Sequence, residues 1–292
     1  MKGELFIMEF RKAERRKAKL RLGITGPAGS GKTYGALLIA FGIGGRIAMI
    51  DTENGSGDLY SSLGEYDVCA LEAPYTVQKY LEAIKMAENA DYDIIIIDSL
   101  SHAWAGEGGL LDMQGKIADS GKKNSYAAWR EVTPLHNKLI DTMLASKCHI
   151  IATMRSKMEY MQTENEQGRK EIRKVGLAPV QRDGMEYEFG VVFDLSVNHT
   201  ASVSKDRTSI FDGQMFKLTQ ETGHVLKKWL DSGIDEEAIK KRRKNLYDSY
   251  MEKFNDAEQA KDAMLRVTGG KSSKDWTEED LQKLETELSI MF

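Results

Sequence analysis

One eight-residue segment constrains the fold of this chain more than any other feature. It consists of Gly26, Pro27, Ala28, Gly29, Ser30, Gly31, Lys32 and Thr33. A glycine, four residues and then Gly-Lys-Thr form a phosphate-holding loop when a strand precedes them and a helix follows. The glycines let the backbone curl so that successive N–H groups point inward, at the positive end of the helix dipole. The context fits, because residues 20–25 predict a strand and residues 33–42 a helix.

The sequence up to about residue 230 alternates short β-branched runs with amphipathic stretches, which is typical of helices packed on a parallel sheet. Residues 94–97 are four consecutive isoleucines, as expected of a central strand covered by helices on both faces. We therefore predict an α/β fold with a mainly parallel central sheet flanked by helices. The predicted strands are 20–25, 46–51, 67–71, 92–98, 148–153, 191–197 and 201–205, the last two forming a hairpin, and the further helices are 76–90, 135–146 and 220–231.

Composition divides the chain into three parts. Residues 1–19 form a basic N-terminal arm, residues 20–232 are the predicted α/β core, and residues 233–292 are highly charged helical sequence. We interpret the last part as a small C-terminal helical module. Within it, Gly269-Gly270 is expected to end one helix and Thr277 to begin the next with a capping-box variant.

The formal net charge of −4 gives no global attraction to nucleic acid, so any such binding needs local basic clusters. Two clusters exist, in the N-terminal arm and at residues 240–244, and each is equally well explained as a solvated face. The two cysteines and five histidines have no zinc-site spacing, and no apolar run approaches the ~20 residues of a membrane span. We expect a cytoplasmic protein without membrane partners.

Acidic residues at strand ends complete a nucleotide site. Lys32 is placed to reach the β- and γ-phosphates of ATP, and the Thr33 hydroxyl to ligate Mg²⁺. Asp98 closes the isoleucine strand at its carboxyl end, where open α/β sheets bind ligands, and is the second predicted metal ligand. Glu53 follows another strand, and a carboxylate there could deprotonate the attacking water. The predicted cofactors are ATP and Mg²⁺.

A strand that ends in Asp51-Thr52-Glu53, between the phosphate loop and Asp98, resembles the RecA family. The resemblance implies a RecA-like P-loop NTPase core in which Glu53 is the general base. It also implies that Tyr60, a few residues later, stacks on adenine. An ordinary half-buried aromatic residue is the alternative for Tyr60.

Within that family the chain is similar to phage RecA-core ATPases of the single-strand-annealing (Sak) type. The likeness rests on the phosphate loop, Asp51 to Ser56, Ile97 to Leu100 with Trp104, Ile150 to Lys157, Arg182 to Phe189, and Lys205 to Arg207. It implies ATP hydrolysis coupled to single-stranded DNA in phage homologous recombination, by annealing or strand exchange, in the host cytoplasm. It further implies a homo-oligomeric ring or filament, with other recombination proteins or a single-strand-binding protein as possible partners.

Three basic residues have candidate catalytic roles. Arg155 follows a predicted strand and could contact the γ-phosphate, although a surface ion pair is the alternative. Lys205 and Arg207 could act across a subunit interface on ATP held by a neighbour, and a charged β-turn explains them equally well.

Two long segments, residues 106–125 and 156–184, have little apolar periodicity and are predicted to be loops that contact DNA. Their lysines and arginines would bind phosphates. Trp104, Trp129 and Tyr160 are candidates to stack bases, and the alternative is that they are core residues. Phe10-Arg11-Lys12-Ala13 has the spacing of an oligomerisation plug or of a simple amphipathic segment. Two other functions stay open: a small-molecule P-loop kinase, and a non-enzymatic adaptor gated by nucleotide.

Overall fold

The computed structural model describes residues 12–120, 124–164, 170–254 and 256–290, with side chains left undescribed at 158–177. The chain forms two compact units. Residues 19–230 make the sheet unit, and residues 231–292 together with 1–18 make the helical unit. None of the helices within the described ranges is long and apolar enough to cross a membrane.

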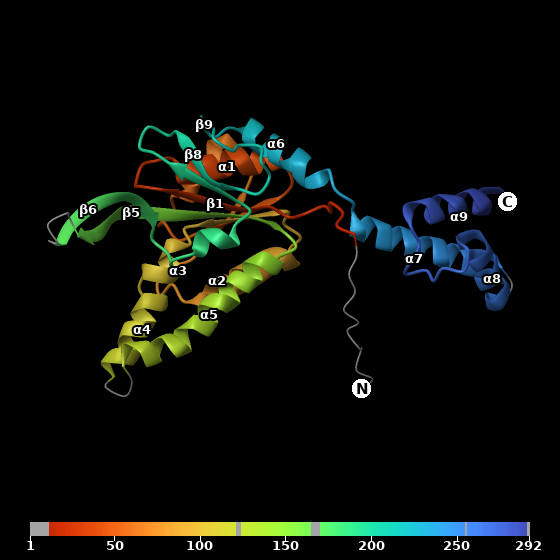
Figure 1. Ribbon diagram of the computed structural model, residues 1–292, viewed down its shortest axis with the longest axis horizontal. Helices are drawn as coiled ribbons and strands as arrows, with labels where there is room; N and C mark the ends of the chain where they lie inside the picture. The colour runs from red at the N-terminus through yellow and green to blue at the C-terminus, as the bar shows by residue number, and fades with distance from the viewer. Residues whose placement is uncertain (1–11, 121–123, 165–169, 255, 291–292) are drawn as a thin grey trace. The chain divides into compact units, whose positions relative to one another are not determined.

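The sheet unit contains a mainly parallel sheet flanked by helices, as predicted (Figure 1). Its strand order is β3-β2-β4-β5-β1-β7-β8-β9. The neighbours from β3 to β7 pair in parallel, and β8 and β9 add antiparallel strands at one edge. The strands are β1 (Arg21–Gly26), β2 (Ile47–Asp51), β3 (Asp67–Ala70), β4 (Ile94–Asp98), β5 (His149–Glu164), β6 (Lys170–Pro179), β7 (Val191–Leu195), β8 (Ala201–Asp206) and β9 (Met215–Phe216).

Helices cover both faces of this sheet. Helices α1 (Lys32–Ile43) and α6 (Gln220–Asp231) pack on one face, against a cluster that includes Ile94 and Ile96. Helices α2 (Val77–Asn89), α3 (Ser101–Ala105), α4 (Leu110–Asp119) and α5 (Ser125–Ala145) lie on the other, where Ile95 and Ile97 are buried (Figure 1). Successive strand residues point to opposite faces, so the isoleucine run of β4 supplies both cores.

The two segments predicted to be loops are structured, which corrects that prediction. Residues 106–125 contain α4, and α5 begins at Ser125, where Asn124 Oδ1 accepts the N–H of Ala127 at 2.8 Å. The helix predicted at 135–146 therefore begins at Ser125, and Pro134 lies inside it. Residues 156–184 mostly form an antiparallel hairpin in which β5 extends beyond the sheet and pairs with β6. Pairing between two segments of one hairpin stabilises them without the apolar periodicity that sequence patterns detect.

The helical unit is built from α7 (Glu236–Lys253), α8 (Ala257–Thr268) and α9 (Glu278–Ile290) around Trp276, Tyr250 and Leu284. As expected, α8 ends at Gly269, which has φ 66°, and the Thr277 N–H donates to Asp280 Oδ2 at 2.7 Å where α9 begins. Lys17 of the N-terminal arm contacts this unit, because its N–H donates to the carbonyl of Ile234 at 2.9 Å.

Candidate active site

The carboxyl ends of four parallel strands meet at one edge of the sheet. The strand register places Gly26 beside Arg155 and Asp51 beside Asp98. Residues separated by more than a hundred positions in the chain are thereby neighbours. This edge is where open α/β sheets bind their ligands.

The phosphate loop links β1 to α1 as the motif predicts. Gly29 and Gly31 have φ values of 73° and 87°, in the left-handed region that side chains other than glycine rarely adopt. Lys32 Nζ donates to the carbonyls of Gly26 and Pro27 at 3.0 and 2.8 Å. Burial lowers the pKa of Lys32, and the nearby Asp98 and Glu53 carboxylates oppose that shift. The ammonium group therefore lies inside the loop, held by two neutral acceptors.

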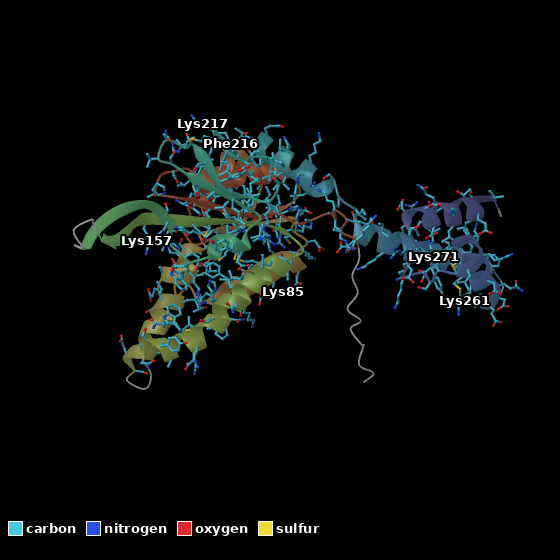
Figure 2. All side chains as sticks on the ribbon, viewed as in Figure 1. Lys85, Lys157, Phe216, Lys217, Lys261 and Lys271 are labelled. Carbon is cyan, nitrogen blue, oxygen red and sulfur yellow. The ribbon has the colours of Figure 1, made fainter. Side chains whose placement is uncertain are left out.

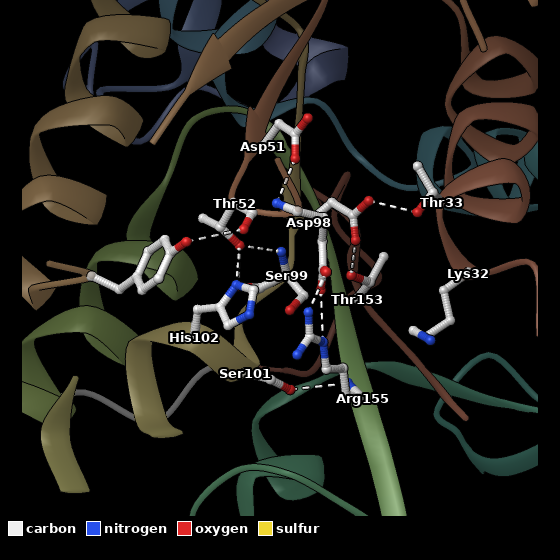
Figure 3. A network of polar contacts seen from close by, with 12 residues as sticks. Lys32, Thr33, Asp51, Thr52, Asp98, Ser99, Ser101, His102, Thr153 and Arg155 are labelled. Atoms are coloured by element: carbon white, nitrogen blue, oxygen red, sulfur yellow. Dashed lines mark hydrogen bonds and ion pairs between the residues drawn. The ribbon is translucent and has the colours of Figure 1, made fainter. Parts of the chain in front are cut away.

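Asp98 is the most buried acid of the site, with 1% of its surface exposed. The Thr33 hydroxyl donates to its Oδ2 at 2.6 Å, and the Thr153 hydroxyl donates to Oδ1 (Figure 3). Burial raises the pKa of Asp98, although both hydroxyl donors oppose the shift. One carboxylate and one hydroxyl, completed by nucleotide phosphates, is a donor set that fits Mg²⁺. Among the described residues, no group of three or more His, Cys, Asp or Glu side chains could hold a metal ion.

Glu53 and Arg155, predicted separately as base and phosphate sensor, form an ion pair. Arg155 Nε donates to Glu53 Oε1 at 2.9 Å, and its Nη2 donates to Oε2. Burial alone would raise the pKa of Glu53, but the hydrogen bond and charge of Arg155 outweigh it, and the pKa lies below its usual value. The carboxylate is thus ionised near neutral pH, and it is paired with the guanidinium of Arg155.

The turn that carries Glu53 is fixed by residues that the sequence interpretation did not assign to the site. Asp51 Oδ1 accepts the N–H of Glu53 at 2.6 Å, and Oδ2 accepts the N–H of Gly57 at 3.0 Å. Thr52 Oγ1 lies 2.7 Å from Nδ1 of His102. The position of Asp51 in the Asp-x-Glu pattern was the only signal available, since His102 approaches Thr52 only through the fold.

Tyr60 lies on the short 3₁₀ helix η1 (Gly57–Leu63). Its ring meets that of Tyr34 edge-on at 5.8 Å, and Tyr34 is 42% exposed. Tyr60 itself is partly buried against the core. Its role as an adenine platform stays a prediction, to which Tyr34 adds a second aromatic ring. Tyr34 directly follows Thr33, so its proximity to the loop could have been inferred from the sequence.

A further residue that the sequence analysis did not assign to the site contacts the phosphate loop from the turn between β7 and β8. His199 Nδ1 lies 3.1 Å from the carbonyl oxygen of Ser30. A Cβ atom on Gly31 would lie 3.2 Å from the same nitrogen. The hairpin turn therefore buttresses the loop, a contact that becomes visible only once β7 is placed beside β1.

Comparison with known proteins identifies the family. A sequence profile described as an AAA domain matches residues 18–228, more than two thirds of the chain. The chain belongs to this family. A search of curated proteins finds no match.

Two solved structures similar to this P-loop ATPase have low sequence identity. The crystal structure of the RadB recombinase is 15% identical, with a TM-score of 0.37, covering 72% of this chain and 90% of that one. A prototypical ATPase from the type III secretion system of pathogenic bacteria is 13% identical, with a TM-score of 0.39, covering 98% and 90%. Likenesses this distant say nothing about what this ATPase acts on.

Lys205 and Arg207 lie away from the phosphate loop of their own chain. In the β7–β8 register Lys205 faces Val192, near the amino end of β7, whereas the loop is at the carboxyl end of β1. Lys205 Nζ and Arg207 Nη2 both donate to the carbonyl of Tyr187, at 2.6 and 3.4 Å. Action of these two residues across a subunit interface stays a prediction.

The predicted base-stacking aromatics pack against each other. Trp104 and Trp129 stack with ring centroids 5.6 Å apart, and the Arg182 guanidinium lies 5.9 Å from the Trp129 ring. Both tryptophans also pack on the core, which favours the structural interpretation. The side chain of Tyr160, and Phe10 and Arg11 of the Phe10-to-Ala13 segment, lie outside the described parts of the ATPase.

Proposed function

We propose that this ATPase hydrolyses ATP with Mg²⁺ in response to single-stranded DNA, and that it works as an oligomer of the phage single-strand-annealing type in homologous recombination. The observation that carries the proposal is the position of the Glu53–Arg155 ion pair. Arg155 lies where β5 leaves the sheet to form the hairpin, and α3 begins next to it. The nucleotide site, the β5–β6 hairpin and the segment that begins with α3 therefore all start from the same strand ends.

The chemistry follows from groups already at the edge of the sheet. The loop N–H groups and Lys32 bind the phosphates, and Thr33 with Asp98 would hold Mg²⁺, which neutralises charge on the phosphates. Glu53 accepts the proton of the attacking water once Arg155 exchanges its carboxylate for the γ-phosphate. A guanidinium binds both groups with similar fork geometry, so the exchange releases the base only when ATP is present.

The hairpin and the α4–α5 pair are the proposed DNA contacts. Lys157, at the base of the hairpin, is exposed (Figure 2). The hairpin segment also carries Arg169, Lys170, Arg173 and Lys174 in its sequence. Phosphate contacts of this kind predict that log affinity for single strands falls with log salt, by about 0.7 per contact. An affinity independent of salt would contradict this part of the proposal.

ATP turnover with and without single-stranded DNA tests the proposal. The parent should release phosphate faster with DNA, and Glu53→Gln should lose turnover by about 10² to 10⁴-fold while still binding ATP. Glu82→Gln, at an exposed position of α2, is the matched control and should behave as the parent. A parent indifferent to DNA, or a Glu53→Gln variant as active as the control, would contradict the proposal.

The nucleotide-gated adaptor is a second candidate, because an ion-paired Glu53 is not free to act as a base. It predicts ATP binding without phosphate release, with or without DNA. The kinase alternative instead predicts that phosphate appears on a metabolite, and it is weakened because its proposed lid, residues 156–184, is largely an antiparallel hairpin.

Action across a subunit interface is the proposed role of Lys205 and Arg207. A complementation assay tests it, since each defective chain can repair the other. Lys205→Ala and Glu53→Gln chains should each be inactive alone, and their mixture should regain part of the parent turnover. A mixture as inactive as its components would exclude the role in trans.

A further inference from the structure

His102, in the first turn of α3, links that helix to the strand end that carries Glu53. Its Nδ1 lies 2.7 Å from Thr52 Oγ1, and its ring stacks on Tyr75 with centroids 4.7 Å apart and an interplanar angle of 17°. The stack fixes the plane of the imidazole, so its nitrogen is aimed at the hydroxyl (Figure 3).

The Thr52 hydroxyl is a junction of three hydrogen bonds. It accepts the N–H of Ser99 at 2.8 Å and lies 3.2 Å from the Ser99 carbonyl oxygen. A hydroxyl has one proton and two lone pairs. If Nδ1 of His102 carries a proton, it donates to the Thr52 hydroxyl oxygen. The Thr52 hydroxyl then donates its own proton to the Ser99 carbonyl, and all three contacts are hydrogen bonds. If Nδ1 is bare, Thr52 donates to it instead. His102 therefore binds Thr52 in either protonation state.

The same turn of α3 also holds Arg155. Ser101 Oγ accepts the backbone N–H of Arg155 at 2.9 Å. Ser101 therefore binds one member of the ion pair, Arg155. The next residue, His102, binds Thr52, which directly precedes the other member, Glu53. The start of α3 thus contacts the side chain of Thr52, next to Glu53, and the backbone of Arg155.

We propose that His102 is a positioning residue for Glu53, and that it mechanically links the nucleotide site to the α3–α4 segment. A displacement of α3 pulls on Thr52 and moves the Glu53 carboxylate relative to Arg155. The link to DNA rests on the function proposed above, whereas the positioning role does not.

Basal turnover tests the positioning role without DNA. His102→Phe keeps a ring against Tyr75 but removes Nδ1, and kcat should fall about tenfold while nucleotide affinity, measured by titration with a fluorescent ADP analogue, stays within about twofold. His102→Asn, whose side-chain amide can occupy the place of Nδ1, should recover most of kcat. His224→Phe replaces an exposed histidine of α6 and should match the parent. Parent-like kcat in His102→Phe would overturn the proposal, and so would an equal loss of kcat and nucleotide affinity.

A double-mutant cycle with Thr52 guards against a variant that is merely unstable. Because His102 acts through the Thr52 hydroxyl, the double variant His102→Phe with Thr52→Val should lose less kcat than the two single losses combined, and fully additive losses would overturn the proposal.

Stimulation of ATP turnover by DNA provides a separate test. If DNA stimulates the parent, His102→Phe should reduce the stimulation ratio towards one; an unreduced ratio would refute the link. A parent that DNA does not stimulate refutes the proposed function and with it the link to DNA, and the basal measurements still decide the positioning role.

Discussion

The phosphate loop of the sheet unit and the basic run of α7 in the helical unit use their cations in opposite ways. Lys32 is held by the carbonyls of Gly26 and Pro27. Arg242 is held by carboxylates: its Nε and Nη2 donate to Glu285 at 2.6 Å each, and its Nη1 donates to Glu278. Glu285 and Glu278 keep the pKa of Arg242 above its usual value.

The difference distinguishes a cation available for a ligand from one used in folding. Exchanging two neutral carbonyls for phosphate oxygens strengthens the electrostatic interaction, whereas pulling Arg242 away from two carboxylates leaves both unpaired. The number of basic residues in a segment is therefore a poor guide to binding.

Lys32→Met should give the largest effect of any single change. The variant loses the charge that meets the phosphates, and we expect turnover to fall by about 10² to 10³-fold or more, with weaker ATP binding. Phosphate release and nucleotide titration measure it. The melting temperature should change little, because the hydrogen bonds of Lys32 go to the loop carbonyls of Gly26 and Pro27. A Lys32→Met variant that keeps its turnover would show that Lys32 does not bind the phosphates.

Arg155→Gln should have a smaller effect on rate, together with a shift in pH dependence. In the parent, Arg155 keeps the pKa of Glu53 below its usual value, so the base stays ionised on the acidic side. Without that charge, burial raises the pKa, and the acid limb of kcat/KM should move to higher pH. We expect the rate at the optimum to fall about tenfold, since one cation at the γ-phosphate is lost.

The control for that change is Arg130→Gln, on α5, whose pH profile should overlay that of the parent. An acid limb that stays in place in Arg155→Gln would mean that the ion pair does not govern ionisation of the base.

The local parts of this site were predictable from the sequence, and the long-range parts were not. Gly26 to Thr33 and Asp98 lie as predicted because each needs only its own strand and turn. The Glu53–Arg155 pair joins residues 102 positions apart, so only the strand order brings them together. The hairpin and α4 were mistaken for loops because their stability comes from pairing and packing and not from periodicity. His102, His199 and Thr153 carry no motif, and only the structure places them at the site.

Thr153→Val tests the metal half of the site and should have a moderate effect. Loss of the hydroxyl leaves Oδ1 of the buried Asp98 without its donor, so the carboxylate is less well oriented towards a metal. The Mg²⁺ concentration needed for half-maximal nucleotide binding should rise several-fold, by the ~1 kcal/mol typical of one hydrogen bond. Thr153→Ser keeps the hydroxyl and should stay close to the parent. Equal Mg²⁺ requirements in both variants would show that Thr153 does not orient Asp98.

Arg242→Gln should have the smallest effect, and only on stability. Its carboxylate partners are partly exposed, so solvent screening limits the loss to about 1 kcal/mol in the free energy of unfolding. Lys241→Gln is the matched control, because Lys241 is the exposed neighbour in the same basic run, and its variant should stay within about 0.5 kcal/mol of the parent. Chemical denaturation measures both, and basal ATP turnover should be unchanged in each. If Arg242→Gln instead lowered ATP turnover while leaving stability intact, the basic run of α7 would belong to function, and the contrast with Lys32 would fail.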